Sequence, residues 1–411
     1  MAKVLLTVLT VVAVARSASG QDWPEFRGPD GQGISTERDL PIEWSEARNV
    51  VWKAAVPGRG WSSPVVAGGR VWITSATGDR DVSLRALAFD VETGHELVNT
   101  EVFRIRGGAS INPKNSHASP SPIVDGDRVY VHFGAQGTAA LTTAGEVVWK
   151  TRFSYESQHG AGGSPVLFED LLILSCDGVD TAFVVALDKR TGKTRWKTFR
   201  RQPWDQAYST PLVIRTGERT QVVSVGAFRA VAYDPASGKE IWRVAYADGF
   251  SNVPRPVYGN DLVYIATGFQ QPTLIAVRPG GSGDVTKTQV AWTLTRGAPL
   301  TPSPLLVGGE LYVVNDSGIA SCLEAKTGEI IWQARLSGTF SASPVFADGR
   351  IYFLSEQGVA TVIAPGREFR RLAANRLDGA ILASPAVASG SIFIRTESHL
   401  YRIGKSRNSG L

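Results

Sequence analysis

The chain has 411 residues, with 43 Gly, 22 Pro and 11 Trp but a single Met, a composition that is typical of turn-rich β-structure rather than of helices. The formal charge is +5, and it falls to about +3 without Lys3 and Arg16 of the first segment. A charge this small, scattered along the chain, argues against nucleic-acid binding. One large repetitive domain is therefore expected.

Residues 1–20 have the features of a cleavable signal peptide. Lys3 is followed by an apolar stretch over residues 4–15 and then by small residues up to Gly20. The apolar stretch is too short to span a membrane, and no Cys follows it to accept a lipid anchor. We therefore expect an exported protein, periplasmic or secreted, without a membrane span or a lipid anchor.

Residues 21–48 are predicted to form an extended arm. Gly and Pro recur over residues 22–35 without any period, so a regular helix or strand is not expected there. Trp23 and Phe26 should press against the rest of the fold, because large aromatic side chains are more often buried for their area than used for chemistry.

A Pro-led apolar run recurs from residue 49 onward, as in the Ser-Pro-Val-Val segment around Pro64. Its eight copies are at Pro64, Pro122, Pro165, Pro211, Pro256, Pro304, Pro344 and Pro385. Their average separation is about 46 residues, which is the period of a propeller blade. Each unit is long enough for four short strands.

A hairpin signature recurs as well and is clearest over residues 186–196. An apolar run ends at Asp188, a tight Thr-Gly turn follows, and a second strand ends in Trp196. This A-x-D-x-x-T-G-x-x-x-W pattern resembles the repeat of the pyrroloquinoline-quinone (PQQ)-like β-propellers. The resemblance implies that a Trp docks each blade against the next, here Trp52, Trp149, Trp196, Trp242, Trp292 and Trp332.

The eighth unit ends without its last strand, and residues 49–56 carry the missing pattern at the other end of the chain. Pairing the two would close the ring and remove exposed strand edges. The sequence thus predicts an all-β, eight-bladed β-propeller of four-stranded antiparallel blades over residues 49–403. It would be closed by an N-terminal strand and followed by a flexible tail at residues 404–411.

Long loops are expected on one face of this propeller. Connections between blades, and those between second and third strands, emerge together, whereas the other connections are tight turns. Binding residues are usually carried by loops on a rigid scaffold, so this loop face is the candidate functional surface. Its candidate binding residues are His117, His159, Asp177, Tyr208, Arg255, Asp316 and Glu356. Their spacing matches no usual ligand set, so no metal site is predicted.

The resemblance implies two kinds of function, because the repeat is shared by quinoprotein dehydrogenases and by non-enzymatic scaffolds such as BamB. A dehydrogenase would hold PQQ with Ca²⁺, in some members beside a Cys pair or a Cys-x-x-Cys-His haem motif. Neither Cys signature is present. The favoured interpretation is a monomeric, non-catalytic, BamB-like scaffold without a cofactor, which binds a protein, peptide or envelope component through its loop face. A PQQ-dependent oxidoreductase is the alternative, and a carbohydrate-active or hydrolytic propeller is the second alternative.

Overall fold

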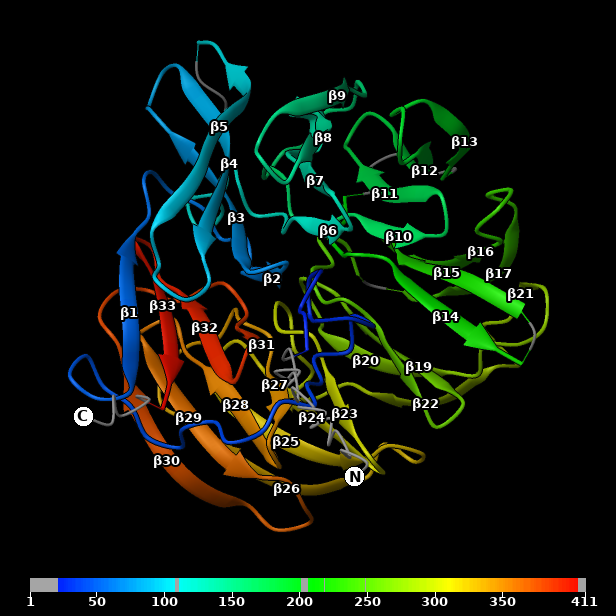
Figure 1. Cartoon of the computed structure of the whole chain (residues 1–411). Coiled ribbons are helices and arrows are strands. Elements are labelled where there is room, and N and C mark those ends of the chain that lie inside the picture. Colours follow the sequence, from blue (N-terminus) through cyan, green and yellow to red (C-terminus); the bar gives the residue numbers. More distant parts are fainter. Residues whose placement is uncertain (1–20, 108–110, 201–205, 218, 248, 406–411) are drawn as a thin grey trace, which may run out of the picture.

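The computed structural model describes residues 21–107, 111–200, 206–217, 219–247 and 249–405, so the predicted signal peptide and residues 406–411 of the predicted tail lie outside the described residues. The strands of these segments form eight sheets around one axis (Figure 1). The predicted eight-bladed, all-β propeller is confirmed. No helix in these segments is long and apolar enough to cross a membrane.

The first four blades follow the chain in order. Blade 1 comprises β2 (Val65–Ala67), β3 (Arg70–Thr77), β4 (Val82–Asp90) and β5 (Glu96–Ile105). Blade 2 comprises β6 (Ile123–Asp125), β7 (Arg128–His132), β8 (Thr138–Thr142) and β9 (Val147–Thr151), with a 3-10 turn, η1 (Gly134–Gln136), after β7. Blade 3 comprises β10 (Val166–Phe168), β11 (Leu171–Asp177), β12 (Ala182–Asp188) and β13 (Thr194–Phe199). Blade 4 comprises β14 (Leu212–Thr216), β15 (Arg219–Val225), β16 (Arg229–Tyr233), β17 (Glu240–Ala245) and the short β21 (Gly283–Asp284).

The remaining blades complete the ring. Blade 5 comprises β18 (Val257–Gly259), β19 (Leu262–Thr267), β20 (Thr273–Val277) and β22 (Val290–Leu294). Blade 6 comprises β23 (Leu305–Val307), β24 (Glu310–Val314), β25 (Ile319–Glu324) and β26 (Ile330–Arg335). Blade 7 comprises β27 (Val345–Ala347), β28 (Arg350–Leu354), β29 (Val359–Ala364) and β30 (Arg370–Arg376). Blade 8 comprises β31 (Ala386–Ala388), β32 (Ser391–Arg395), β33 (His399–Gly404) and β1 (Val50–Ala55).

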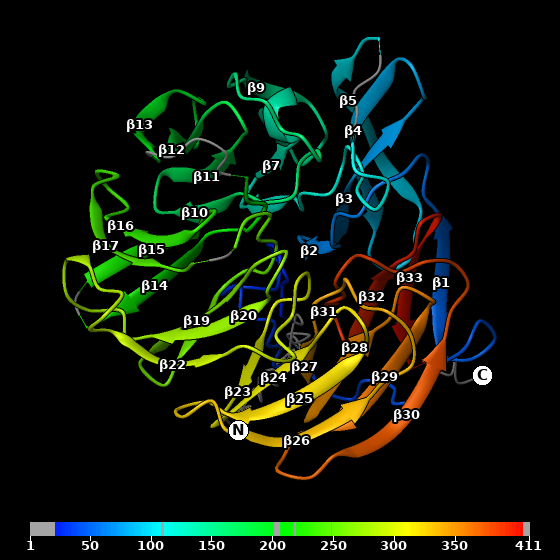
Figure 2. The same ribbon diagram turned by 180° about the vertical axis from the view of Figure 1, so that it is seen from behind.

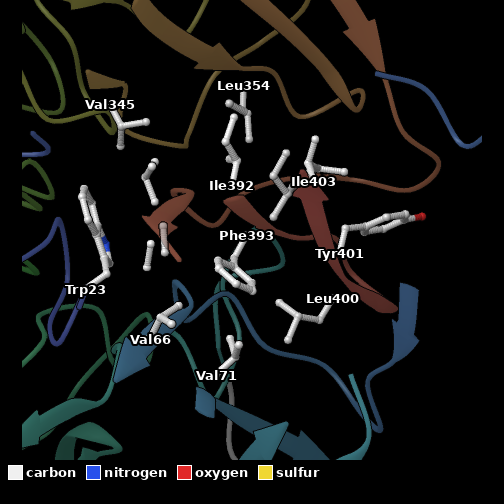
Figure 3. Close-up of a cluster of buried hydrophobic side chains, with 14 of the residues drawn as sticks. Trp23, Val66, Val71, Val345, Leu354, Ile392, Phe393, Leu400, Tyr401 and Ile403 are labelled. Carbon is white, nitrogen blue, oxygen red and sulfur yellow. The ribbon is translucent and has the colours of Figure 1, made fainter. Parts of the chain in front are cut away.

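The ring is closed by β1, as predicted. It runs antiparallel to β33, with Trp52 opposite Arg402 and Ala55 opposite His399 (Figure 1). Because the amide of Gly404 donates to the carbonyl of Asn49, the last strand extends one residue past the predicted limit at 403. The apolar core at this joint includes residues of the arm and of blades 1, 7 and 8 (Figure 3), among them Trp23, Val66, Val71, Val345, Leu354, Phe393 and Tyr401.

Five of the six predicted docking Trp residues share one arrangement. The indole N–H donates to a backbone carbonyl of the following blade at 2.8–3.0 Å, namely Trp52 to Val91, Trp149 to Lys189, Trp196 to Pro235, Trp292 to Ala325 and Trp332 to Gly366. Four of these rings lie against the Gly of the neighbouring Thr-Gly or Ser-Gly turn. At Gly192, for example, φ is +71° and a Cβ would come within 2.5 Å of the Trp149 ring. Gly is therefore required both for the turn and for the docked ring.

Trp242 departs from the expected arrangement. Its indole N–H donates to Gln221 Oε1 within its own blade, at 2.7 Å. The cause is β21, which lies in the connection between β20 and β22 of blade 5. It pairs parallel with β17 of blade 4 and places Gly283 opposite Trp242. This fifth strand buries Trp242 completely and makes blade 4 an exception to the predicted four strands.

The arm crosses the face opposite the loop face. It pairs with the innermost strands of several blades, through Trp23 to Val66 of β2, and Ile34 to Phe346 of β27. In Figure 1 the dark-blue arm lies in front of these strands, and in Figure 2 it lies behind them. Its later part runs outward over blade 7, where Trp44 stacks on Tyr352 at 6.2 Å. The arm therefore covers one end of the central channel.

Candidate functional site

The central channel opens on the loop face as a funnel of about 650 Å³. Its walls are contributed by the connections that lead into all eight blades, together with Phe269 and Asp316 from two loops between second and third strands. Loops from around the whole ring thus converge on one concave site, which is the kind of place where propellers and other rigid scaffolds carry ligands.

Phe26 of the arm closes the bottom of the funnel. It is held by the buried Arg255, whose Nη1 donates to the Phe26 carbonyl at 2.5 Å and whose Nε donates to the Pro211 carbonyl at 3.1 Å. The next residue, Arg27, is anchored by its own side chain, whose Nη2 donates to the carbonyls of Gln32 and Pro304 at 2.8 and 2.7 Å. Phe26 therefore packs against the propeller, as predicted, and also lines the funnel.

The arm carries buried charges beneath this floor. Arg255 Nη2 lies 3.5 Å from Glu25 Oε1. Burial raises the pKa of Glu25 to about 7, against the opposing effect of Arg255. Burial, and then the neighbouring Arg255, lower the pKa of Arg27 to about 9. Two guanidinium groups and the Glu25 carboxyl group therefore share a poorly solvated region next to the funnel, and the exposed carboxylate of Asp30 acts on both Glu25 and Arg27.

A ring of hydroxyl groups surrounds the axis just above this floor. Its members are the Ser or Thr that precede the repeated Pro, namely Ser63, Ser121, Ser164, Thr210, Ser303, Ser343 and Ser384, and each is at most 4% exposed. Each hydroxyl oxygen accepts a backbone N–H from the same position of the preceding blade, at 2.8–3.1 Å. Arg255 takes the eighth position, and its bond to Pro211 spans the one joint where no hydroxyl is available.

Aromatic side chains form part of the funnel wall. Phe250 lies between Phe228 and Phe269, with ring centroids 6.2 and 5.8 Å apart. Phe269 is 61% exposed, although it is a large apolar residue. Trp61 faces the funnel from the connection between blades 8 and 1. Exposed aromatic rings that meet in a concave site are typical of ligand-binding surfaces.

The carboxylates at the mouth of the funnel are engaged by a cation. Lys114 Nζ lies 2.8 Å from Glu356 Oε1 and 3.9 Å from Asp316 Oδ1. Although burial opposes it, hydrogen bonds from Lys114 and Ser341 lower the pKa of Glu356. Asp316 also accepts the amides of Leu300 and Thr301, at 2.9 and 3.1 Å. These acidic groups order the loops of the mouth.

The structure brings four of the seven predicted binding residues together. His159, Tyr208 and Asp316 line the funnel, and Glu356 joins them through Lys114. The rings of His159 and Tyr208 lie side by side, with centroids 6.0 Å apart.

The other three predicted residues lie elsewhere. His117 lines a separate hollow beside blade 1, where burial lowers its pKa. Asp177 is buried and forms an ion pair with Arg200 at 3.2 Å. Arg255 is buried under the funnel floor rather than displayed on the loop face, because the arm supplies two of its partners, the Phe26 carbonyl and the Glu25 carboxyl group.

Sequence reasoning missed the hydroxyl ring and the aromatic wall. The signal for the ring was present, since Ser or Thr precedes Pro in seven of the eight repeat units. For Phe250 and Phe269 there was no comparable signal, because each lies in a loop that does not repeat. Among the described residues, no three His, Cys, Asp or Glu side chains come together as a metal-binding group would require.

The fold and the funnel define a β-propeller with one end of its channel plugged by its own arm and the other end open. Comparison with known proteins identifies the family. A family model described as "Outer membrane protein assembly factor BamB" matches residues 34–164 and 180–409, and the chain belongs to this family, in agreement with the predicted PQQ-like, BamB-like relationship.

Individual relatives are more distant. The chain is 26% identical over 217 residues to the outer membrane protein assembly factor BamB of Shewanella oneidensis, a match covering 47% of this chain and 51% of that protein. The chain thus spans about half the length of this curated relative. Among solved structures, BamB from Moraxella catarrhalis aligns with a TM-score of 0.62 at 13% identity, over 88% of this chain and 99% of that chain. A europium-containing methanol dehydrogenase aligns with a TM-score of 0.55 at 12% identity, over 84% and 89%. These two alignments show a common fold.

Proposed function

We propose that this protein is a non-catalytic, exported propeller that captures an extended peptide segment of an envelope protein in the funnel of its loop face. The observation that carries the proposal is the funnel itself, an open concave site of about 650 Å³ with aromatic side chains in its wall, of which Phe269 is 61% exposed. A cavity of this size accommodates a short stretch of polypeptide with its side chains. The relative from Shewanella oneidensis is named for outer membrane protein assembly, which supports an envelope protein as the partner.

The same evidence supports a site for binding rather than for chemistry. A general acid or base needs a free carboxyl or imidazole group within reach of the substrate. At the mouth of the funnel, Asp316 and Glu356 are both engaged by Lys114 and by loop hydrogen bonds. The imidazole of His159 also lines the funnel, with its ring beside that of Tyr208, but the two carboxylates that could work with it are held by these contacts. A hydrolytic or carbohydrate-active function therefore has less support than binding.

A PQQ-dependent oxidoreductase also has less support. Ca²⁺ takes six to eight oxygen ligands, with carboxylates as the strongest. The ammonium group of Lys114 already lies beside the carboxylates of Asp316 and Glu356, so this pair does not fit a Ca²⁺–PQQ site. The likeness to a methanol dehydrogenase is one of fold. A periplasmic monomer without a cofactor is the state that we propose.

The proposal is tested with the protein lacking the predicted signal peptide (residues 1–20). Fluorescent, unstructured peptides from envelope proteins are screened for binding to it by fluorescence polarisation. We expect peptides with apolar side chains to bind, and we expect Phe269→Ala to lower their affinity at least tenfold. Phe199→Ala is the matched control, because Phe199 is 59% exposed but lies at the rim of blade 3, away from the funnel. If no peptide binds, or if the control variant weakens binding equally, funnel capture is refuted.

A further inference from the structure

The hydroxyl ring has unused hydrogen-bonding capacity. A hydroxyl group carries one proton and two acceptor lone pairs. In each of the seven groups, one lone pair accepts a backbone N–H, but none of the seven protons is donated to a described residue. The groups are almost fully buried and face the funnel, so seven unused donors converge on its base.

From this arrangement we infer that the base of the funnel binds a carboxylate, and that the ligand of the funnel is a carboxylic acid with an aromatic or apolar body. The inference rests on the proposed function and specifies its ligand. An ionised carboxylate is an acceptor-only group with about four lone-pair sites, so it suits a ring that offers donors. Hydrogen bonds to an ionised acceptor are also about twice as strong as those between neutral groups.

Hydroxyl donors that a single carboxylate does not reach can be joined to it by bridging waters, as in many wet binding sites. A neutral polyhydroxyl ligand such as a sugar is a poorer match, since each of its hydroxyls brings a donor as well as acceptors. The ring therefore favours an acid over a sugar.

The charge beneath the floor has the right sign for an acid. The guanidinium of Arg255 is bonded to the carbonyl of Phe26, and Arg27 is the next residue of the arm. Glu25 pairs with Arg255, and Asp30, a second carboxylate that acts on Glu25 and Arg27, is exposed to solvent. Two buried cations therefore face one buried carboxyl group in this region. Burial also raises the pKa of Glu25 to about 7, which reduces its negative charge near neutral pH. The buried groups beneath the floor thus carry a net positive charge, and low solvation there limits its screening.

The walls above the ring fit an apolar body. Phe26 forms the floor, and Trp61, Phe250 and Phe269 lie around the wall. An aromatic group attached to the acid could pack against these rings, where aromatic pairs gain beyond simple area burial. Two sources share this chemistry: the C-terminal end of a peptide and a free aromatic carboxylic acid.

The test compares acids with their uncharged amides. The probes are Ac-Ala-Ala-Ala-Phe as the free acid and as the C-terminal amide, together with 3-phenylpropionate and 3-phenylpropionamide. Binding is followed by calorimetry with the leader-free protein. We expect the acid of at least one pair to bind tenfold or more tightly than its amide. The pair that shows this difference identifies the source as a peptide end or a free acid.

Ring variants link the effect to the hydroxyls. Ser343→Ala and Ser384→Ala should each reduce the acid-to-amide affinity ratio, whereas Ser343→Thr should keep it, because Thr210 already occupies this position in blade 4. The thermal midpoint of each variant is measured first, and if an alanine variant is unfolded, Ser→Thr and Ser→Cys variants of the same position provide the comparison. Equal binding of acid and amide, or a ratio that no ring variant changes, would overturn the inference.

The outcome also separates this inference from the proposed function. If acid and amide bind equally and Phe269→Ala weakens both, capture in the funnel stands and the carboxylate site is refuted. If neither these probes nor the screened peptides bind, both fail.

Discussion

Removing the Trp52 side chain should strongly destabilise the propeller at its closing joint. Trp52 lies in β1, donates its indole N–H to the Val91 carbonyl at 3.0 Å, and packs on Gly94 and on Phe393 at a centroid distance of 6.0 Å. Truncating a buried Trp to Ala costs about 3–5 kcal/mol. Because Arg402 also donates to the Val91 carbonyl, Trp52→Phe leaves that oxygen bonded and should cost only about 1 kcal/mol.

The assay is equilibrium urea unfolding of the protein without the predicted signal peptide (residues 1–20), followed by far-ultraviolet circular dichroism. Trp52→Ala should lower the unfolding midpoint clearly and Trp52→Phe slightly. The control Phe199→Ala removes a ring that is 59% exposed and packs on Phe183, so it should cost no more than about 1 kcal/mol. A Trp52→Ala protein within about 1 kcal/mol of the wild type would refute the idea that the closing blade depends on this docking contact.

Three further predictions concern the arm and the turns. Arg255→Ala should destabilise the fold by about 3 kcal/mol or more, because it leaves Glu25 buried without its partner. It should also speed tryptic cleavage of the arm, and an unchanged cleavage rate would contradict the idea that Arg255 holds the arm in the channel. Since the pKa of Glu25 is raised from 4.5 to about 7, its contribution to stability is present below pH 4.5 and is lost as the pH rises to about 7. Unfolding of Glu25→Gln should lack this loss, and identical pH profiles would disprove it. Gly192→Ala should lower the free energy of unfolding in a urea titration by about 2–4 kcal/mol, since its Cβ would meet the Trp149 ring. Gly126→Ala is the control: its Cβ would have no atom within 4 Å, so the loss should be only about 1 kcal/mol.

The propeller could be predicted because its signals are local and repeated. The Thr-Gly turn, the Pro-led strand and the strand-ending Trp occur within each unit, so their agreement across units specified the blades and the need for closure. Trp242 shows the limit of this reasoning. Its repeat is regular, but β21 arrives from a loop of the next blade, and only a non-local contact decides that the indole bonds to Gln221.

The candidate site was less accessible to sequence reasoning, because it depends on segments that do not repeat. The sequence placed His159 and Tyr208 on the correct face, and both line the funnel. It did not predict that the arm would cross the axis, so Arg255 was expected on the loop face although two of its partners, Phe26 and Glu25, lie in the arm. In the sequence, the serines before Pro only marked the start of strands. They form a hydrogen-bonded ring only in the closed propeller, because each bond joins two neighbouring blades.

The closing strand has a consequence for the order in which the molecule folds. Tyr401 bonds to Glu46 and Asn375 bonds to Trp44 across 355 and 331 positions of sequence, respectively. The segment before the closing strand therefore lacks these partners in blades 7 and 8 until nearly the whole polypeptide has been synthesised. Contacts so distant in sequence slow folding and leave partly formed states exposed to aggregation. Ring closure should accordingly be a late event, and the interior blades must remain soluble for as long as their two ends are apart.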